Sequence, residues 1–537
     1  MEPRRETTGG NQPGNRREPP YSRGTGGVPG GQSLRGQRNP RDPRTSGRPL
    51  PGAAEPLPAG RPAPGRTPAP LPAAVVQAGV PHGAREGGWL PDCVWTGEKF
   101  ESGLAFFADA MGRITRFSRE PADLAAARRL AGQAVLPGLV NAHSHSFHRV
   151  LRGRPGHTAA GSWDEAHTSL LHVASERLTA EEIFAVARMV FLEMLLAGVT
   201  CVGEFHGLHH QPDGTPWPEP DFLSREIARA AHEVGIRLAL LKTLQVRSGD
   251  RTEVGSAPAR SRHASVDQFV RDTEQLRAGI ARDFPPDEVW LGVAADSLAT
   301  VPLEAFKTLG AYARTHRLRL HAHVATTSAE NAACTSEYGR PAIALLAEHG
   351  LLDKRFTAVD ACHPTDDEVK LLGSTRAAVC TCPVTEHQRG RTGAPAEKLL
   401  AAGVGLALGS DSNLSIDLLA EARMLEYRLR EGGRPRGGES VLAGWQAATV
   451  NGARSLGAPG GALEVGRPAD FFTVNLFDPA IAGADPASLL AGIVLGLERR
   501  AIRDVWVGAR QRIAGGRHVN HGPIVGRFVD VQKRLWA

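Results

Sequence analysis

Two histidines separated by one residue, His143 and His145, are the first candidates for chemistry. They lie in the run Leu136–Arg149 (LPGLVNAHSHSFHR), where an apolar segment and a Pro-Gly pair precede the His-x-His pair. Alternate residues of a β-strand point to the same face, so both imidazoles can reach one point. Imidazole is a common ligand of divalent transition metals. The run therefore predicts a buried strand that ends in a metal-binding cradle.

The rest of the chain must supply a scaffold that brings further ligands to this point. Apolar strands are predicted to follow the His-x-His run, with helices between most of them, at 199–202, 236–244, 289–295, 318–325, 356–360, 377–380 and 404–408. Eight such units in a row favour a (β/α)₈ barrel of the TIM type. In that fold the catalytic groups lie at the C-terminal ends of the strands.

Two of the later strands end in residues that suit a metal. The fifth strand carries His321 and His323, and the eighth ends just before Asp411. Nitrogen ligands together with one carboxylate suit Zn²⁺, with Fe²⁺ as the alternative. An aspartate beside such an ion can also accept a proton from water. The sequence therefore predicts one divalent metal, held by the strand-one pair, a strand-five histidine and Asp411.

The flanks of the barrel differ from it in composition. Residues 1–86 hold 13 arginines, no lysine, six acidic residues and 17 of the 39 prolines, which predicts a disordered tail. This segment has a net charge of +7, whereas the whole chain has +6, so the remainder has a charge of −1. Nucleic acid is therefore not expected as a partner of the folded part, and only the basic tail fits such a role.

A small β-domain is predicted from both ends of the folded part, 87–136 and 461–530, around a barrel at 137–460. Its strands are expected at 103–108 and 112–117, and the C-terminal β segments are expected to pair with them. The chain has no apolar run of about 18 residues, which excludes a membrane helix. It has no apolar segment near its start, and its six cysteines are too few for a disulfide scaffold. These features predict a cytoplasmic protein.

These motifs resemble the amidohydrolase superfamily of metal-dependent hydrolases, and within it the formimidoylglutamate deiminases. The resemblance covers about residues 90–530. It includes the His-x-His run, the segment 204–210 (EFHGLHH) with the Pro-Asp-Gly that ends at Gly214, and the segment 409–415 (GSDSNLS). It implies a (β/α)₈ barrel with a small β-domain, hydrolysis of a carbon–nitrogen bond, and the metal ligands His143, His145, His323 and Asp411.

The chain departs from this family at positions that should move protons. Deaminating relatives use a glutamate three residues after the strand-five ligand, where this chain has Thr326. They use a histidine at the end of strand six, where this chain has Asp360, with His363 three residues later. Asp360 can act as a base or orient water, but it cannot donate a proton as an imidazole does. Asp411, Asp360 and His363 are the candidate catalytic groups.

The positions that should bind substrate differ as well. By resemblance, Asp164 and Ala299 stand where the deiminases have arginines, and Gly207 stands where they have a tyrosine. Asp296 replaces a histidine and His148 replaces a glutamine. A pocket that loses two guanidiniums and gains carboxylates should repel a dicarboxylate. His148, Asp164, Asp296 and Thr326 are the candidate residues for binding the substrate.

Three functions remain open at this stage. The first is a formimidoylglutamate deiminase with a rearranged proton path. The second is a metal-dependent hydrolase for another small molecule, either neutral or cationic, and this is the favoured one. The third is a pseudoenzyme that keeps the fold and binds a partner or a metal without catalysis. Other barrels of this kind suggest a homodimer, although that is an analogy of fold.

Overall fold

An eight-stranded parallel sheet forms the centre of the protein. The computed structural model describes residues 87–155, 163–247, 259–431 and 438–537. The strands follow one another in sequence order: β6 (Leu139–Ser144), β7 (Val199–His206), β8 (Arg237–Leu244), β9 (Val289–Ala295), β10 (Leu320–Val324), β11 (Phe356–Asp360), β12 (Ala378–Thr381) and β13 (Leu406–Leu408). The backbone amide of Ser410 donates to the carbonyl of His143, and that of His145 to Asp411, both at 2.9 Å. These bonds nearly close the sheet, which confirms the predicted barrel.

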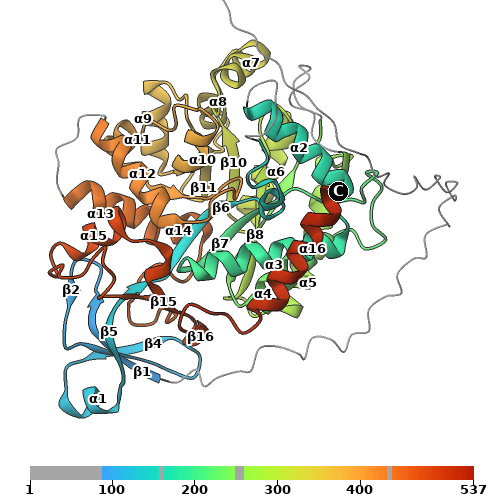
Figure 1. The fold of residues 1–537 in the computed structure, drawn as a ribbon. Helices are drawn as coiled ribbons and strands as arrows, with labels where there is room; N and C mark the ends of the chain where they lie inside the picture. Colours follow the sequence, from blue (N-terminus) through green and yellow to red (C-terminus); the bar gives the residue numbers. More distant parts are fainter. Residues whose placement is uncertain (1–86, 156–162, 248–258, 432–437) are drawn as a thin grey trace, which may run out of the picture. The chain divides into compact units, whose positions relative to one another are not determined.

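Helices cover the outside of this barrel (Figure 1). They include α3 (Ala180–Leu196), α4 (Phe222–Val234), α5 (Val266–Asp283), α6 (Leu303–Thr315), α7 (Ser328–Tyr338), α8 (Ala342–Glu348), α9 (Asp366–Thr375), α10 (Pro383–Gln388), α11 (Ala396–Ala401), α12 (Leu418–Glu431), α13 (Gly438–Ala447) and α14 (Val450–Leu456). The helix α3 shows how local sequence sets these bounds. Thr179 and Glu182 form a reciprocal capping box at its start. At its end Gly198 takes a left-handed φ of 79°, which turns the chain into β7.

A second, mixed sheet draws its strands from both sides of the barrel. Its order is β16-β15-β14-β5-β1-β3-β4, with β2 paired to β1. The N-terminal members are β1 (Gly87–Trp95), β2 (Phe100–Glu101), β3 (Ala105–Ala108), β4 (Ile114–Ser118) and β5 (Arg128–Pro137), and a short helix, α1 (Pro121–Ala126), precedes β5. The C-terminal members are β14 (Phe471–Asn475), β15 (Ile502–Val507) and β16 (Arg510–Ile513). The tail predicted at 1–86 lies outside the described residues.

The C-terminal strands join this sheet at a different place from the one expected. β14 pairs with β5, not with β3 or β4. The expected pairing is present only just before these strands, where residues 112–114 and 466–469 share a bridge and three backbone hydrogen bonds. The reason is that β5 leads directly into β6, so pairing with β5 brings the end of the chain back beside the barrel. Two helices of this region, α15 (Leu489–Gly496) and α16 (His521–Leu535), lie against the barrel helices. Figure 1 shows α16 beside α3.

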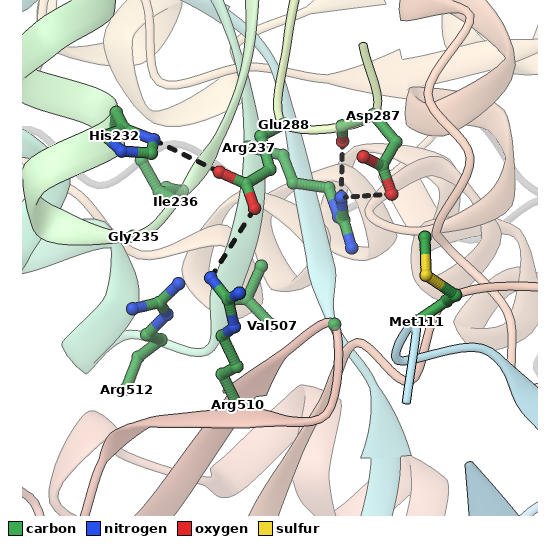
Figure 2. Close-up of a pocket in the computed structure, with 11 residues that line it drawn as sticks. Met111, His232, Gly235, Ile236, Arg237, Asp287, Glu288, Val507, Arg510 and Arg512 are labelled. Atoms are coloured by element: carbon green, nitrogen blue, oxygen red, sulfur yellow. Dashed lines mark hydrogen bonds and ion pairs between the residues drawn. The ribbon is translucent and has the colours of Figure 1, made fainter. Parts of the chain in front are cut away.

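A buried ion pair joins the mixed sheet to the N-terminal end of the barrel. Arg237, the first residue of β8, donates to both carboxylate oxygens of Asp470, at 2.6 and 3.0 Å. Both side chains are almost fully buried. A small surface pocket lies beside Arg237. Figure 2 shows Asp287 next to Arg237, and Glu288 between His232 and Arg510. This pocket is at the end of the barrel opposite to the predicted metal ligands.

We expect Arg237→Met to destabilise the protein by about 3–5 kcal/mol, because it leaves the carboxylate of Asp470 buried without its partner. The midpoint of urea-induced unfolding measures this change. Arg225→Met is the matched control: Arg225 pairs with Asp283 and Glu219 at the surface, where such pairs contribute about 0–1 kcal/mol. Equal midpoints for the two variants would show that the ion pair does not stabilise this junction.

Among the described helices, none is both long enough and apolar enough to cross a membrane. The cytoplasmic location and the homodimer remain predictions.

Candidate metal centre

Four side chains converge at the C-terminal end of the barrel. They are His143 at the end of β6, His145 just after it, His323 near the end of β10, and Asp411 three residues after β13. Their ligand atoms all lie within 4.8 Å of one another. The Nε2 atom of His143 is 3.3 Å from Nε2 of His323, and the Nε2 atoms of His143 and His145 are each 3.6 Å from Oδ1 of Asp411. The structure thus brings together the four predicted ligands.

The chemistry of these atoms fits a divalent cation. The Nδ1–H of His323 donates to the carbonyl of Asp296 at 3.1 Å, which leaves the lone pair of Nε2 facing the cluster. Burial lowers the pKa of both His143 and His145, so these imidazoles are neutral ligands. Two ligand atoms about 2.1 Å from one Zn²⁺ at tetrahedral angles lie roughly 3.4 Å apart. Three of the spacings, 3.3 to 3.6 Å, agree with such a site, and all four ligand atoms lie within 4.8 Å of one another.

Asp411 is held as a carboxylate. Burial by itself would raise its pKa, but the interactions with His143 and His145, each at 3.6 Å, and the charge of Arg389 lower that pKa well below the usual value. Its backbone has a left-handed φ of 39°, which an L-residue adopts only where the surroundings impose it. An ionised carboxylate at this point can ligate a cation and accept a proton.

A buried polar network fixes the loops that carry the ligands. The Nδ2 of Asn141 donates to the hydroxyl of Ser410 at 2.6 Å, and this hydroxyl donates to Oδ1 of Asn413 at 2.6 Å. The Nδ2 of Asn413 donates to the Ser144 hydroxyl at 3.0 Å and to the His145 carbonyl at 2.8 Å. The network therefore ties the strand-one ligands to the loop of Asp411.

Glu204, at the end of β7, clamps the other side of His145. Its carboxylate accepts hydrogen bonds from the Ser144 hydroxyl at 2.7 Å and from the backbone N–H of Ser146 at 2.6 Å. Both partners are direct neighbours of His145 in the chain. The sequence analysis did not single out Glu204 or the asparagine network as site residues, although Glu204, Asn141, Ser410 and Asn413 all stand inside the motifs that it quotes.

We expect Glu204→Gln to weaken metal binding about 10- to 100-fold, as is typical when a group that orients a ligand is changed. The amide replaces one acceptor with a donor that faces the N–H of Ser146. Competition with a chelator of known affinity measures the effect. Glu233→Gln, a change on the outer helix α4, is the matched control. Equal metal affinity of the two variants would mean that the clamp has no part in the site.

Asp360 and His363, the other candidates for proton transfer, differ in their contacts. Asp360 is buried at the end of β11, and its Oδ2 is 3.6 Å from Nη1 of Arg391. The backbone N–H of His363 donates to the carbonyl of Ala325, and its carbonyl accepts from the side-chain Nδ2 of Asn331. Among the described residues, no hydrogen bond or ion pair joins its imidazole to the four ligands. Asp360 lies close enough to His143 for its charge to act against the lowering of the pKa of that imidazole, so it is the better placed of the two.

Of the candidates for substrate binding, His148 and Asp164 have side chains that contact residues of the site, whereas Asp296 does not. The ring of His148 stacks on that of His145, with centroids 4.5 Å apart. Asp164, in the first turn of α2 (Trp163–Arg177), pairs with Arg389 and Arg391. The carboxylate of Asp296 instead accepts a hydrogen bond from Thr300, so the site uses the backbone carbonyl of this residue.

A carboxylate lies beside Thr326, although this position has lost the glutamate of the deaminating relatives. Its amide donates to Oε2 of Glu330 at 2.8 Å, which places a carboxylate one helical turn further along the chain. Burial raises the pKa of Glu330. His321, the other histidine of strand five, lies outside the cluster, and its Nε2 is 3.2 Å from the carbonyl of Ser455.

Arg389 and Arg391 are the site residues that most change the sequence-based interpretation. They lie in the loop after α10, at the end of the seventh strand–helix unit. The guanidinium of Arg389 reaches Asp411 of the cluster, and that of Arg391 reaches Asp360. The loss of arginines at the positions of Asp164 and Ala299 stays a prediction from the resemblance, but a different loop brings two guanidiniums to this rim. Their position in the loop region after the seventh strand could have indicated that they lie at the rim of the barrel that carries the site.

Comparisons with known proteins agree with this architecture. The model of the amidohydrolase family matches residues 134–517. The chain is 34% identical to the formimidoylglutamate deiminase of Pseudomonas aeruginosa over 427 residues, which are 78% of this chain and 92% of the relative. It is 29% identical to a 5-methylthioadenosine/S-adenosylhomocysteine deaminase of Moorella thermoacetica, over 72% of this chain and 83% of the relative.

Solved structures show the same fold. An amidohydrolase from Brucella melitensis is 26% identical and aligns with a TM-score of 0.76, over 84% of this chain and all of that one. An adenosine deaminase from Xanthomonas campestris, solved with bound zinc, is 21% identical and aligns with a TM-score of 0.71, over 83% of this chain and 98% of that one.

Proposed function

The chain belongs to the amidohydrolase family, and from this premise we propose that it is a metal-dependent hydrolase that releases ammonia from a carbon–nitrogen bond of a small molecule. The observation that carries the proposal is the convergence of three imidazole nitrogens and one carboxylate at the C-terminal end of the barrel. Among its relatives, the deiminases and deaminases act on bonds of this class.

The metal is proposed to be one Zn²⁺ ion, held by His143, His145, His323 and Asp411. Zinc is present in solved relatives of the same fold, and nitrogen-rich tetrahedral sites suit it. When bound, such an ion polarises the carbon centre and makes water more acidic. The remaining steps depend on the side chains of the protein.

Asp411 and Asp360 are proposed to move the protons. Hydrolysis adds water to the carbon and transfers protons from that water to the departing nitrogen, which leaves as ammonia. The Asp411 carboxylate is ionised and accepts the first proton. Asp360 is buried on the neighbouring side of the site, and we assign to it the second proton, which its carboxylate accepts from the added hydroxyl and passes to the leaving nitrogen. His148 forms the wall beside His145 and contacts the substrate.

The experiment uses the full chain, stripped of metal with a chelator and reloaded with Zn²⁺ or Fe²⁺. Ammonia release is measured for a panel of amidines, formimidoyl amino acids and aminated purines. We expect at least one compound to be hydrolysed only after reloading. If the reloaded protein hydrolyses no member of the panel, the proposal fails and the inactive, binding-only alternative is favoured.

Formimidoylglutamate deiminase activity is the second candidate, because the 34% identity covers 92% of that relative. The substitutions at Thr326 and Asp360 argue against an unchanged mechanism. Turnover of formimidoylglutamate by the reloaded protein, well above that of the other panel members, would favour this specific activity.

A further inference from the structure

Arg389 and Arg391 face the metal centre from one loop. Gly390 separates them and has a left-handed φ of 68°, and both side chains contact Asp164. The Nη1 of Arg389 is 3.8 Å from Oδ2 of Asp411, and the Nη1 of Arg391 is 3.6 Å from Oδ2 of Asp360. The two side chains are 17% and 13% exposed. Both guanidiniums therefore border the space where the reaction is proposed to occur.

The guanidinium of Arg391 is poorly satisfied for a buried cation. Its contacts with Asp164 and Asp360 are 3.5 and 3.6 Å long, and its Nε is buried without a hydrogen-bond partner among the described residues. Charge-assisted hydrogen bonds are usually about 2.7–2.9 Å long. Elsewhere in this protein, the buried Arg149 meets Glu193 at 2.7 and 2.8 Å. Arg391 thus keeps donors available for a further anion.

Other polar atoms in the wall of the site also lack partners. They are Nδ1 of His148, both ring nitrogens of His167 and the hydroxyl of Thr326, all buried and unpaired within the described part of the chain. Burial, followed by the charge of Arg389, lowers the pKa of His167 to about 4, so this imidazole is neutral and lies near the arginine. Buried polar atoms without partners are costly, and their concentration here indicates a surface built for a polar ligand.

We propose that Arg389 and Arg391 form a carboxylate-binding subsite, so that the substrate is a carbon–nitrogen compound bearing a carboxylate group. Planar guanidiniums bind carboxylates through paired hydrogen bonds, which also fixes the orientation of the ligand. The subsite rests on the proposed function of the metal centre. It replaces our expectation of a neutral or cationic substrate, and it uses a loop different from the two positions at which the deiminases carry arginines.

Binding of product analogues tests the subsite without catalysis. Isothermal titration of the zinc-loaded full chain compares N-methylformamide, which has no carboxylate, with N-formylglycine and N-formylglutamate. We expect the carboxylates to bind roughly 10- to 100-fold more tightly, as expected for hydrogen bonds to a charged group. We expect Arg389→Met and Arg391→Met to lose this difference, Arg391→Lys to keep part of it, and the control Arg277→Met, on the outer face of α5, to keep all of it.

The outcomes separate the subsite from the proposed function. If neither formyl amino acid binds more tightly than N-methylformamide, or if the preference survives in both Arg→Met variants, the subsite is wrong. A preference that depends on the arginines, in a protein that hydrolyses nothing, supports the subsite and contradicts the proposed function. In an active protein, ammonia release from N-formimidoylglycine should exceed that from N-methylformamidine by a similar factor in kcat/KM.

Discussion

Asp411→Asn is expected to reduce metal-dependent ammonia release by on the order of 10³-fold or more. The substitution keeps the size of the side chain but removes its negative charge, which both holds the cation and accepts the first proton. Changing a group that only orients a ligand already costs about 10- to 100-fold, so the loss of a ligand should cost more. Initial rates of the reloaded protein measure the effect, and His143→Ala should behave in the same way.

The control for this prediction is Asp485→Asn. Asp485 caps the exposed turn before α15, where its carboxylate accepts from Ser488 at 2.7 Å, and asparagine caps equally well there. If Asp411→Asn released ammonia as fast as Asp485→Asn, the proposed metal site and the role of Asp411 as proton acceptor would both be wrong.

Asp360→Asn is expected to lower kcat by about 10²- to 10⁴-fold, which is the usual contribution of a positioned acid or base. Metal content should stay the same, because Asp360 is not one of the four converging ligands. KM should change less than kcat, since the asparagine side chain still fills the space beside Arg391. Steady-state kinetics and elemental analysis of the same preparation separate these effects.

His363→Gln serves as the comparison for Asp360→Asn. The imidazole of His363 makes no hydrogen bond or ion pair with the ligands in the described part of the chain, so we expect a smaller loss in kcat. A larger loss for His363→Gln than for Asp360→Asn would reverse the assignment of the two residues. Asp360→Glu, which keeps the carboxylate, should retain more activity than Asp360→Asn.

The barrel and its four converging residues could be predicted from the sequence because their signals are local. The two histidines of β6 follow the two-residue period of a strand, and apolar runs mark the other strands. In a barrel of parallel strands, residues at the strand ends must meet at one rim. His323 and Asp411 are 88 positions apart in the chain, and both therefore come together with the histidine pair of β6.

The rest of the site depends on contacts that no local pattern encodes. Arg389 and Asp164 are 225 residues apart and meet only because α2 and the loop after α10 cover the same rim. Asp164 stands where the deiminases have an arginine, so the sequence shows that a guanidinium is lost at this position. It does not show that the loop after α10 brings other guanidiniums to the same rim. The pairing of β14 with β5 is similar, since strand partners depend on how the chain returns to the barrel.

The metal content of the purified full chain tests the central claim most directly. Elemental analysis after growth in zinc-supplemented medium and dialysis should find about one equivalent of Zn²⁺ or Fe²⁺ per chain. The same analysis should find a large loss of metal in Asp411→Asn and an unchanged content in Asp485→Asn. A wild-type protein that holds no stoichiometric divalent metal, even after reloading, would contradict the account.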